Sequence, residues 1–200
     1  MKNSLVILAF FAVGVLAGWQ GWIPEGLVGD NAGKMALYAL MFCVGFSLGS
    51  DSDALSDIKR LDPRLLLLPL MTIAGTLAGC AIVSTVIQGR SATDCLAIGS
   101  GFGYYSLSSI FITKFKGTEM GTVAILSNIM REITTLLCAP LLARVFGKLA
   151  PISAGGATSM DTTLPIITHC SGEKFAILSI YHGFVVDFSV PFLVTLFCTI

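Results

Sequence analysis

The chain has 200 residues, of which 54% are hydrophobic and only 12% are charged, and its mean hydropathy is +0.85. A soluble globular domain carries about a quarter charged residues, so half that density is typical of a protein that lies in lipid. The formal net charge is zero, which argues against a nucleic-acid partner. We therefore expect an all-α, polytopic membrane protein, with residues 1–200 forming a single transmembrane domain.

Five apolar stretches are interpreted as helices that cross the bilayer in full. They cover residues 4–21, 35–50, 65–87, 121–145 and 175–200. The first stretch has two interpretations. A short apolar run after Lys2 fits a secretory signal peptide, whereas Trp19 and Trp22 fit the interfacial end of a membrane helix.

Two further apolar stretches, residues 95–113 and 152–169, are interrupted by small and helix-breaking residues. A broken helix leaves backbone N–H and C=O groups that lipid cannot satisfy, so such a segment is expected to face protein or water. We predict two re-entrant or broken helices, with the breaks at Gly99, Gly101, Gly103, Gly155 and Gly156. Paired interruptions of this kind indicate a binding site near the bilayer midplane. The distribution of Lys and Arg predicts a cytoplasmic N-terminus and an outer C-terminus, whether these segments re-enter or cross.

Glu132 lies in the middle of the fourth predicted span, next to Arg131. A charged side chain at that depth costs roughly 2.5 to 3.5 kcal/mol on insertion scales, so it is expected to face the protein interior or a wet cavity. Adjacent helical residues point about 100° apart, so Arg131 is not expected to pair with Glu132. Asp161 adds a second acid in the second interrupted stretch, although Asp161 or Ser159 could instead cap a helical turn. Two such acids indicate a site for a cationic substrate or for protons.

Other polar side chains are candidates for the lining of this site, although such groups in membrane helices more often hydrogen-bond to neighbouring helices. They are Tyr104, Tyr105, Ser106, Ser108, Asn128, Thr158 and Ser159. Arg131 either clamps a substrate carboxylate, balances the charge of Glu132 or is a structural charge. His182 is either a proton relay or an interior histidine held by hydrogen bonds, and Asp187 stays outside the predicted site.

The sequence shows no metal or cofactor motif. The six cysteines are scattered without a C-x-x-C pair and are interpreted as packing residues. There is also no H-E-x-x-H or G-x-S-x-G motif, so we expect neither an enzyme nor a bound cofactor.

Four blocks occur in order along the chain: SGFGYYSLS at residues 100–108, LSNIMRE at 126–132, GATSMDTTLP at 156–165 and HGF at 182–184. They resemble the signature blocks of the lysine exporter LysO family, and ALMFCVGFSL at residues 39–48 resembles a further one. The resemblance implies a multi-pass carrier of the cell inner membrane that exports L-lysine or a close cationic amino acid. It also favours a membrane helix, rather than a signal peptide, at residues 4–21.

Full-length members of that family have additional N-terminal spans, which have no counterpart in this chain. The resemblance therefore implies either a truncated chain or a split transporter, with a small companion membrane protein or a homo-oligomer completing it. Export of a cation against the membrane potential must be driven, which favours proton-coupled antiport with Glu132 and Asp161 alternating between proton and lysine. The alternative is a subunit that does not transport and scaffolds a companion carrier.

Overall fold

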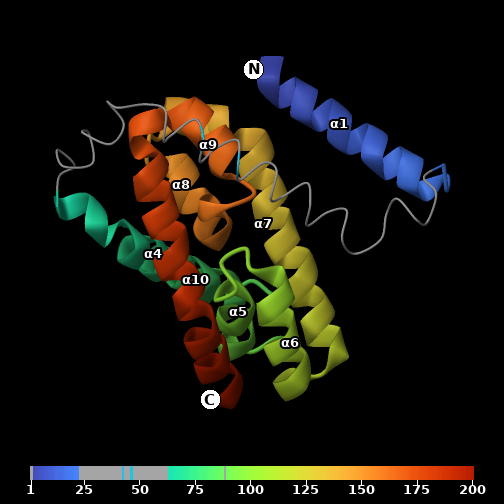
Figure 1. Cartoon of the computed structure of the whole chain (residues 1–200). Helices are drawn as coiled ribbons and strands as arrows, with labels where there is room; N and C mark the ends of the chain where they lie inside the picture. The colour runs from blue at the N-terminus through green and yellow to red at the C-terminus, as the bar shows by residue number, and fades with distance from the viewer. Residues whose placement is uncertain (1, 23–41, 43–45, 47–62, 88) are drawn as a thin grey trace.

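The structure is a computed structural model, and it describes residues 2–22, 42, 46, 63–87 and 89–200. Every regular element in these ranges is helical, which confirms the predicted all-α class (Figure 1). The α-helices are α1 (Lys2–Trp19), α4 (Leu68–Ser84), α5 (Ala92–Gly99), α6 (Tyr105–Lys116), α7 (Thr118–Val145), α8 (Ala150–Gly155), α9 (Leu164–Ser171) and α10 (Ala176–Thr199). Three 3-10 segments join them: η1 (Pro63–Leu67), η2 (Gly156–Met160) and η3 (Glu173–Phe175).

Three helical stretches in the described part are long and apolar enough to cross a membrane. They are Pro63–Ser84, Thr118–Val145 and Glu173–Thr199, and they correspond to the third, fourth and last predicted spans. The predicted span at residues 4–21 forms the apolar helix α1. The predicted span at residues 35–50 lies outside the described residues, except for residues 42 and 46.

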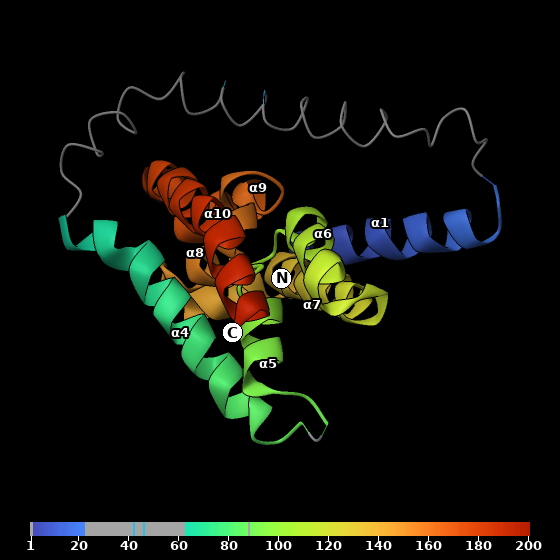
Figure 2. The same ribbon diagram turned by 90° about the horizontal axis from the view of Figure 1, so that it is seen from below.

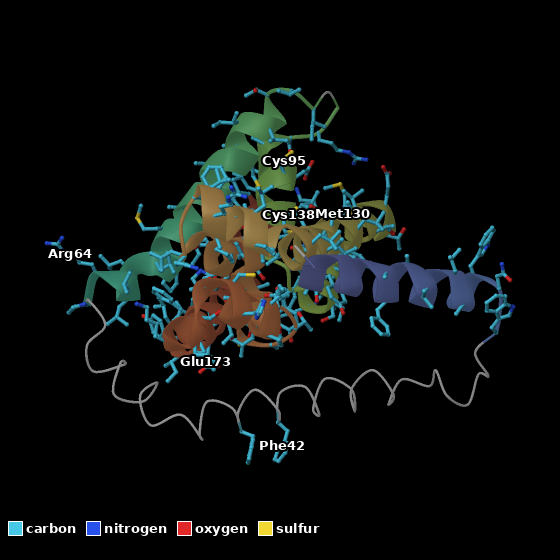
Figure 3. The ribbon with its side chains drawn as sticks, turned by 90° about the horizontal axis from the view of Figure 1, so that it is seen from above. Phe42, Arg64, Cys95, Met130, Cys138 and Glu173 are labelled. Atoms are coloured by element: carbon cyan, nitrogen blue, oxygen red, sulfur yellow. The ribbon has the colours of Figure 1, made fainter. Side chains whose placement is uncertain are left out.

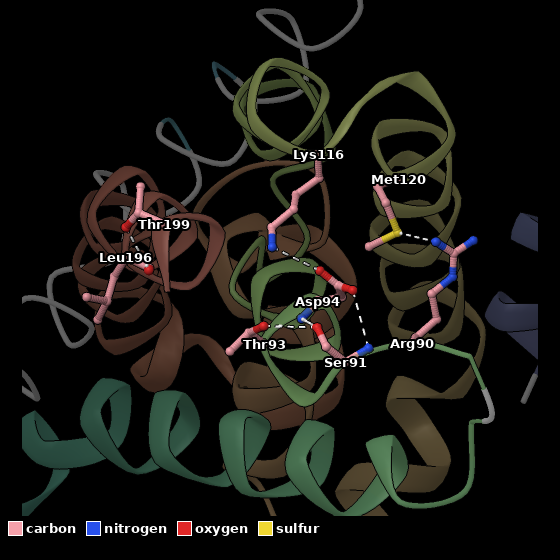
Figure 4. Close-up of polar contacts among 8 residues, drawn as sticks. All are labelled: Arg90, Ser91, Thr93, Asp94, Lys116, Met120, Leu196 and Thr199. Atoms are coloured by element: carbon pink, nitrogen blue, oxygen red, sulfur yellow. Dashed lines mark hydrogen bonds and ion pairs between the residues drawn. The ribbon is translucent and has the colours of Figure 1, made fainter.

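The first interrupted segment folds back on itself. α5 ends at Gly99 and α6 begins at Tyr105, and the tip between them contains Phe102 (φ 46°) and Gly103 (φ 97°). Asp94 in the first turn of α5 lies 3.3 Å from the ammonium of Lys116, the last residue of α6. The open ends of α5 and α6 therefore lie together, as Figure 4 shows for these two side chains.

The second interrupted segment has the same plan. Pro151 lies in the first turn of α8 and Pro165 in the first turn of α9. A proline is well tolerated there, because the N–H that it lacks would have no partner within the helix. Lys148, which precedes α8, donates from Nζ to the carbonyl of Cys170 near the end of α9 at 2.7 Å. The open ends of α8 and α9 therefore also lie together.

The two hairpins enter the molecule from opposite ends of α7. The α5–α6 hairpin opens beside the start of α7, where Arg90 pairs with Glu119, whereas the α8–α9 hairpin follows the end of α7. Figure 1 shows α5 and α6 towards one end of α7 and α10, and α8 and α9 towards the other. The tips meet between them, where the N–H of Ala157 donates to the carbonyl of Phe102 at 2.9 Å.

Small residues allow this close approach. Gly156 has a φ of 62°, and a Cβ built there would collide with the carbonyl of Phe102. Phe102 and Ala157 belong to the main buried cluster, together with Val186 and Val190 of α10. α4 packs beside α5, as seen from below in Figure 2. The hairpin tips are therefore held on three sides, by α4, α7 and α10.

The cysteines of the described part are free thiols. Cys95 and Cys138, for example, lie on separate helices, α5 and α7 (Figure 3).

Candidate functional site

A cavity of about 240 Å³ lies where the two hairpin tips meet α7 and α10. Four separate stretches of the chain line it. The lining residues are Gly103, Tyr104, Tyr105, Ser106, Glu132, Ala157, Thr158, Met160, Asp161, Thr162 and Asp187. The cavity therefore depends on the tertiary fold, because no single element supplies it.

Three half-buried acids reach this cavity from three elements. Glu132 comes from α7, Asp161 from the turn between η2 and α9, and Asp187 from α10. The ion pairs of the described part, Arg90–Glu119 and Lys116–Asp94, involve none of them. The wall of the cavity therefore carries three carboxyl groups that neither of these described ion pairs involves.

Thr162 lies between two of the acids. Its backbone N–H donates to Oδ1 of Asp161 at 2.5 Å, and its hydroxyl donates to the same oxygen at 3.3 Å. The Thr162 side chain also interacts with the carboxylate of Glu132. Glu132 and Asp161 thus form one acidic group at the cavity, in which Thr162 fixes the Asp161 carboxylate.

The start of α6 forms another wall. Tyr104, Tyr105 and Ser106 occupy its N-cap and first two positions, and no side chain caps this helix end. The first-turn N–H groups of a helix have no intrahelical acceptor, and the helix dipole is positive there. This end of α6 is therefore suited to a negatively charged group, close to the acids that suit a positive one.

Arg131 turns away from the cavity. Its Nε donates to the carbonyl of Ala154 and its Nη2 to that of Ser153, both at 2.9 Å, and Nη1 lies 3.3 Å from Oγ1 of Thr76. The guanidinium also lies 5.9 Å from the centre of the Phe102 ring. Arg131 therefore binds the last turn of α8 and holds both hairpin tips against α4 and α7.

Asn128 fixes the first tip from one turn earlier on α7. Its Oδ1 accepts from the N–H of Gly103 at 2.8 Å, and its Nδ2 donates to the carbonyls of Ala124 (2.9 Å) and Ile98 (3.3 Å). A side chain at Gly101 would collide with the Asn128 amide. All the described hydrogen bonds of this amide therefore go to backbone.

His182 is fully buried and uses both ring nitrogens within the protein. Nδ1 lies 2.9 Å from Oγ of Ser159, and Nε2 lies 2.9 Å from Oγ1 of Thr72. The Ser159 hydroxyl also donates to the carbonyl of Ser179 at 3.0 Å. These bonds join α4, η2 and α10 behind the cavity wall.

Residues 8–198 match the sequence model of the family described as Lysine exporter LysO. The chain belongs to the LysO family. It is 30% identical over 195 residues to a putative lysine exporter of Haemophilus influenzae, covering 96% of each chain. It is 32% identical over 195 residues to Lysine exporter LysO of Escherichia coli, covering 98% of this chain and 64% of that protein. No solved structure matches the chain.

Membership of the LysO family makes the chain a multi-pass membrane protein of a transporter family, not of an enzyme family. The structure separates the predicted site residues into two sets, according to whether they line the cavity. Those that line the cavity are Glu132, Asp161, Tyr104, Tyr105, Ser106, Thr158 and Gly103. Those that lie outside its lining are Arg131, Asn128, Ser108, Ser159, His182, Gly99, Gly101, Gly155 and Gly156.

Asp187 is the acid that sequence reasoning left out of the site. It lies outside the blocks that resemble the LysO family, yet it lines the cavity with Glu132 and Asp161. The sequence signal that points to Asp187 is the same one that identifies Glu132, because each is an acidic residue inside an apolar stretch.

Proposed function

We propose that this chain exports L-lysine, or a close cationic amino acid, across the cell inner membrane. The observation that supports this is the cavity, where the acidic group of Glu132 and Asp161 faces the start of α6. Free lysine at neutral pH carries two ammonium groups and one carboxylate. The acids suit an ammonium group, and the first turn of α6 suits the carboxylate.

The proposed mechanism is proton-coupled antiport. Moving one positive charge outward against an inside-negative potential costs about 2.3 kcal/mol per 100 mV, so export needs a driving ion. An acid that binds either a proton or an ammonium group couples the two, because the incoming proton displaces the substrate. Glu132 and Asp161 are suited to this role, since both face the cavity and share Thr162.

We further propose that both hairpins re-enter the membrane, each from its own side. The contacts that hold the two ends of each hairpin together support this. The basic residues then give the orientation. Arg64, Lys148 and Lys174 lie at or beside segments that pack together at one end, through Leu65, Leu149 and Phe175. Arg90 and Lys116 lie at the opposite end, with the open ends of α5 and α6. An excess of basic residues marks the cytoplasmic side, which makes the first end cytoplasmic.

A radiolabelled-lysine counterflow assay in proteoliposomes tests the proposal. Wild-type protein is expected to exchange lysine, and Glu132→Gln is expected to abolish exchange while leaving expression intact. Glu119→Gln is the matched control, because Glu119 lies on the same helix but pairs with Arg90 in an exposed position. Equal lysine exchange by wild type and Glu132→Gln would contradict the proposed role of Glu132.

The assay is also run with a companion membrane chain where one is encoded nearby. A companion chain or a second copy of this chain is proposed to complete the transporter, because Tyr105 and Ser106 at the cavity are exposed in the single chain. Lysine exchange that required the companion but was unaffected by Glu132→Gln would indicate that the companion is the carrier.

A further inference from the structure

Asp187 has an environment unlike those of the other two cavity acids. It projects from α10, which is continuous through this region, whereas Asp161 lies on a turn. Phe184 and Phe188, three residues before and one residue after it, are 64% and 65% exposed. Val186 and Val190 are fully buried. Asp187 thus lies at the border between the apolar outer face of α10 and the cavity.

No hydrogen bond or ion pair of the described residues satisfies the Asp187 carboxylate. The described contact of this group is electrostatic, with the like charge of Asp161. By contrast, Asp161 accepts two hydrogen bonds from Thr162. A carboxylate within a membrane span is costly unless a cation or a hydrogen-bond donor faces it. The open side of this carboxylate is the cavity.

The walls of the cavity carry different groups. The start of α6 lies against α7 one turn before Glu132, where the N–H of Gly103 donates to Oδ1 of Asn128 at 2.8 Å. On α10, one turn before Asp187, a Cβ built at Gly183 would collide with Met160, the residue before Asp161. The helix end that suits a carboxylate therefore lies beside Glu132, whereas Asp187 lies on the wall that α10 and η2 form next to Asp161.

An α-amino acid carries its carboxylate and its α-ammonium on the same carbon. If the carboxylate lies at the start of α6, the α-ammonium falls beside Glu132 and Asp161, and the side chain extends towards Asp187. We infer that Asp187 is a specificity-determining residue that binds the side-chain ammonium of a diamino acid. This inference rests on the proposed function and adds to it the reason for preferring a substrate with two amino groups.

Two substitutions at this position test the inference with the full chain in proteoliposomes. Competition of lysine counterflow by ornithine and by norleucine, which lacks the side-chain ammonium, measures specificity. Asp187→Asn is expected to reduce the preference for lysine over norleucine by about tenfold or more, because the amide lacks the negative charge that strengthens the bond to the side-chain ammonium. Asp187→Glu carries its carboxylate one methylene further into the cavity, so it is expected to shift preference from lysine towards the shorter ornithine.

Ser189→Ala is the control on the same helix. The Ser189 hydroxyl bonds to the carbonyl of Val186 and lies outside the cavity lining, so specificity should not change.

A shift of preference with Asp187→Glu supports the inference, even if Asp187→Asn fails to fold. Unchanged ranking of the three substrates in Asp187→Glu would overturn it. The proposed function would then still stand, provided that wild type exchanges lysine and Glu132→Gln does not. Absence of lysine exchange by wild type would overturn both.

Discussion

Ala157 donates its backbone N–H to the carbonyl of Phe102 at 2.9 Å, and this bond ties the tip of one hairpin to the tip of the other. The residues on both sides of the bond lie beside the cavity, since Gly103 and Thr158 line it. The shape of the site therefore depends on contact between two turns that are more than 50 residues apart in the sequence.

Gly156→Ala tests this contact. The new Cβ would collide with the Phe102 carbonyl, and a φ of 62° is unfavourable for alanine, so we expect a loss of roughly 1 to 3 kcal/mol of stability together with loss of lysine exchange. Thermal unfolding of the purified protein measures the first effect. Gly147→Ala separates strain from collision, because Gly147 also has a positive φ but has nothing near its Cβ position. Equal effects of the two substitutions would argue against the importance of the tip contact.

Arg131→Lys tests whether the guanidinium holds the hairpins or clamps the substrate. Lysine cannot reproduce the forked bonds to Ser153 and Ala154, and each hydrogen bond to a charged group is worth about 1.5 to 3 kcal/mol. We expect lower thermal stability with an unchanged preference for lysine over lysine amide, which lacks the carboxylate. A selective loss of that preference would place Arg131 on the substrate carboxylate instead.

His182→Ala leaves the hydroxyls of Ser159 and Thr72 without their imidazole partner. Unsatisfied buried polar groups cost about 1 to 3 kcal/mol each, so the melting temperature should fall. The number of protons exchanged per lysine should stay the same, because both ring nitrogens are already bonded within the protein. A pH electrode and labelled lysine measure this ratio together. A changed ratio would restore the proton-relay interpretation.

Asp94 lies outside the three candidate spans, at the open end of the first hairpin. Its carboxyl group makes the stability of the protein depend on pH. Burial alone would raise the pKa of Asp94, but hydrogen bonds from Ser91 and the pairing with Lys116 outweigh it and hold the pKa below its usual value. A lowered pKa in the folded state means that the stabilisation is complete above the ordinary value of about 3.9 and is lost as the pH falls through the folded value. Wild type should therefore lose more stability than Asp94→Asn on acidification below about pH 4. Parallel melting-temperature curves for the two proteins would contradict this.

Much of the fold follows from local features of the sequence. The length of the apolar stretches predicts spans at residues 65–87, 121–145 and 175–200. The structure has an apolar helical stretch at each of these places: Pro63–Ser84, Thr118–Val145 and Glu173–Thr199. The breaks after Gly99 and Gly155 were predicted from glycine, because the backbone there must leave the helix. Glu132 and Asp161 were chosen because buried charge is costly, and that argument needs no knowledge of neighbours.

The directions of the other side chains could not be predicted in this way. Arg131 and His182 carry the same signal of polarity in an apolar stretch, yet their partners lie on α8 and α4. Asp187 was set aside for lack of a surrounding motif, although its helix lies against the cavity. Which way each residue points depends on packing between elements that are distant in the sequence.

The opposed entry of the hairpins has a geometric consequence. α4 followed by α5 and α6 forms one unit, and α7 followed by α8 and α9 forms another with the reverse direction through the molecule. In transporters built from two units of opposite sense, an exchange of their conformations exposes the same site to the other compartment. The acids at the junction would then change the solution that they face without travelling across the bilayer.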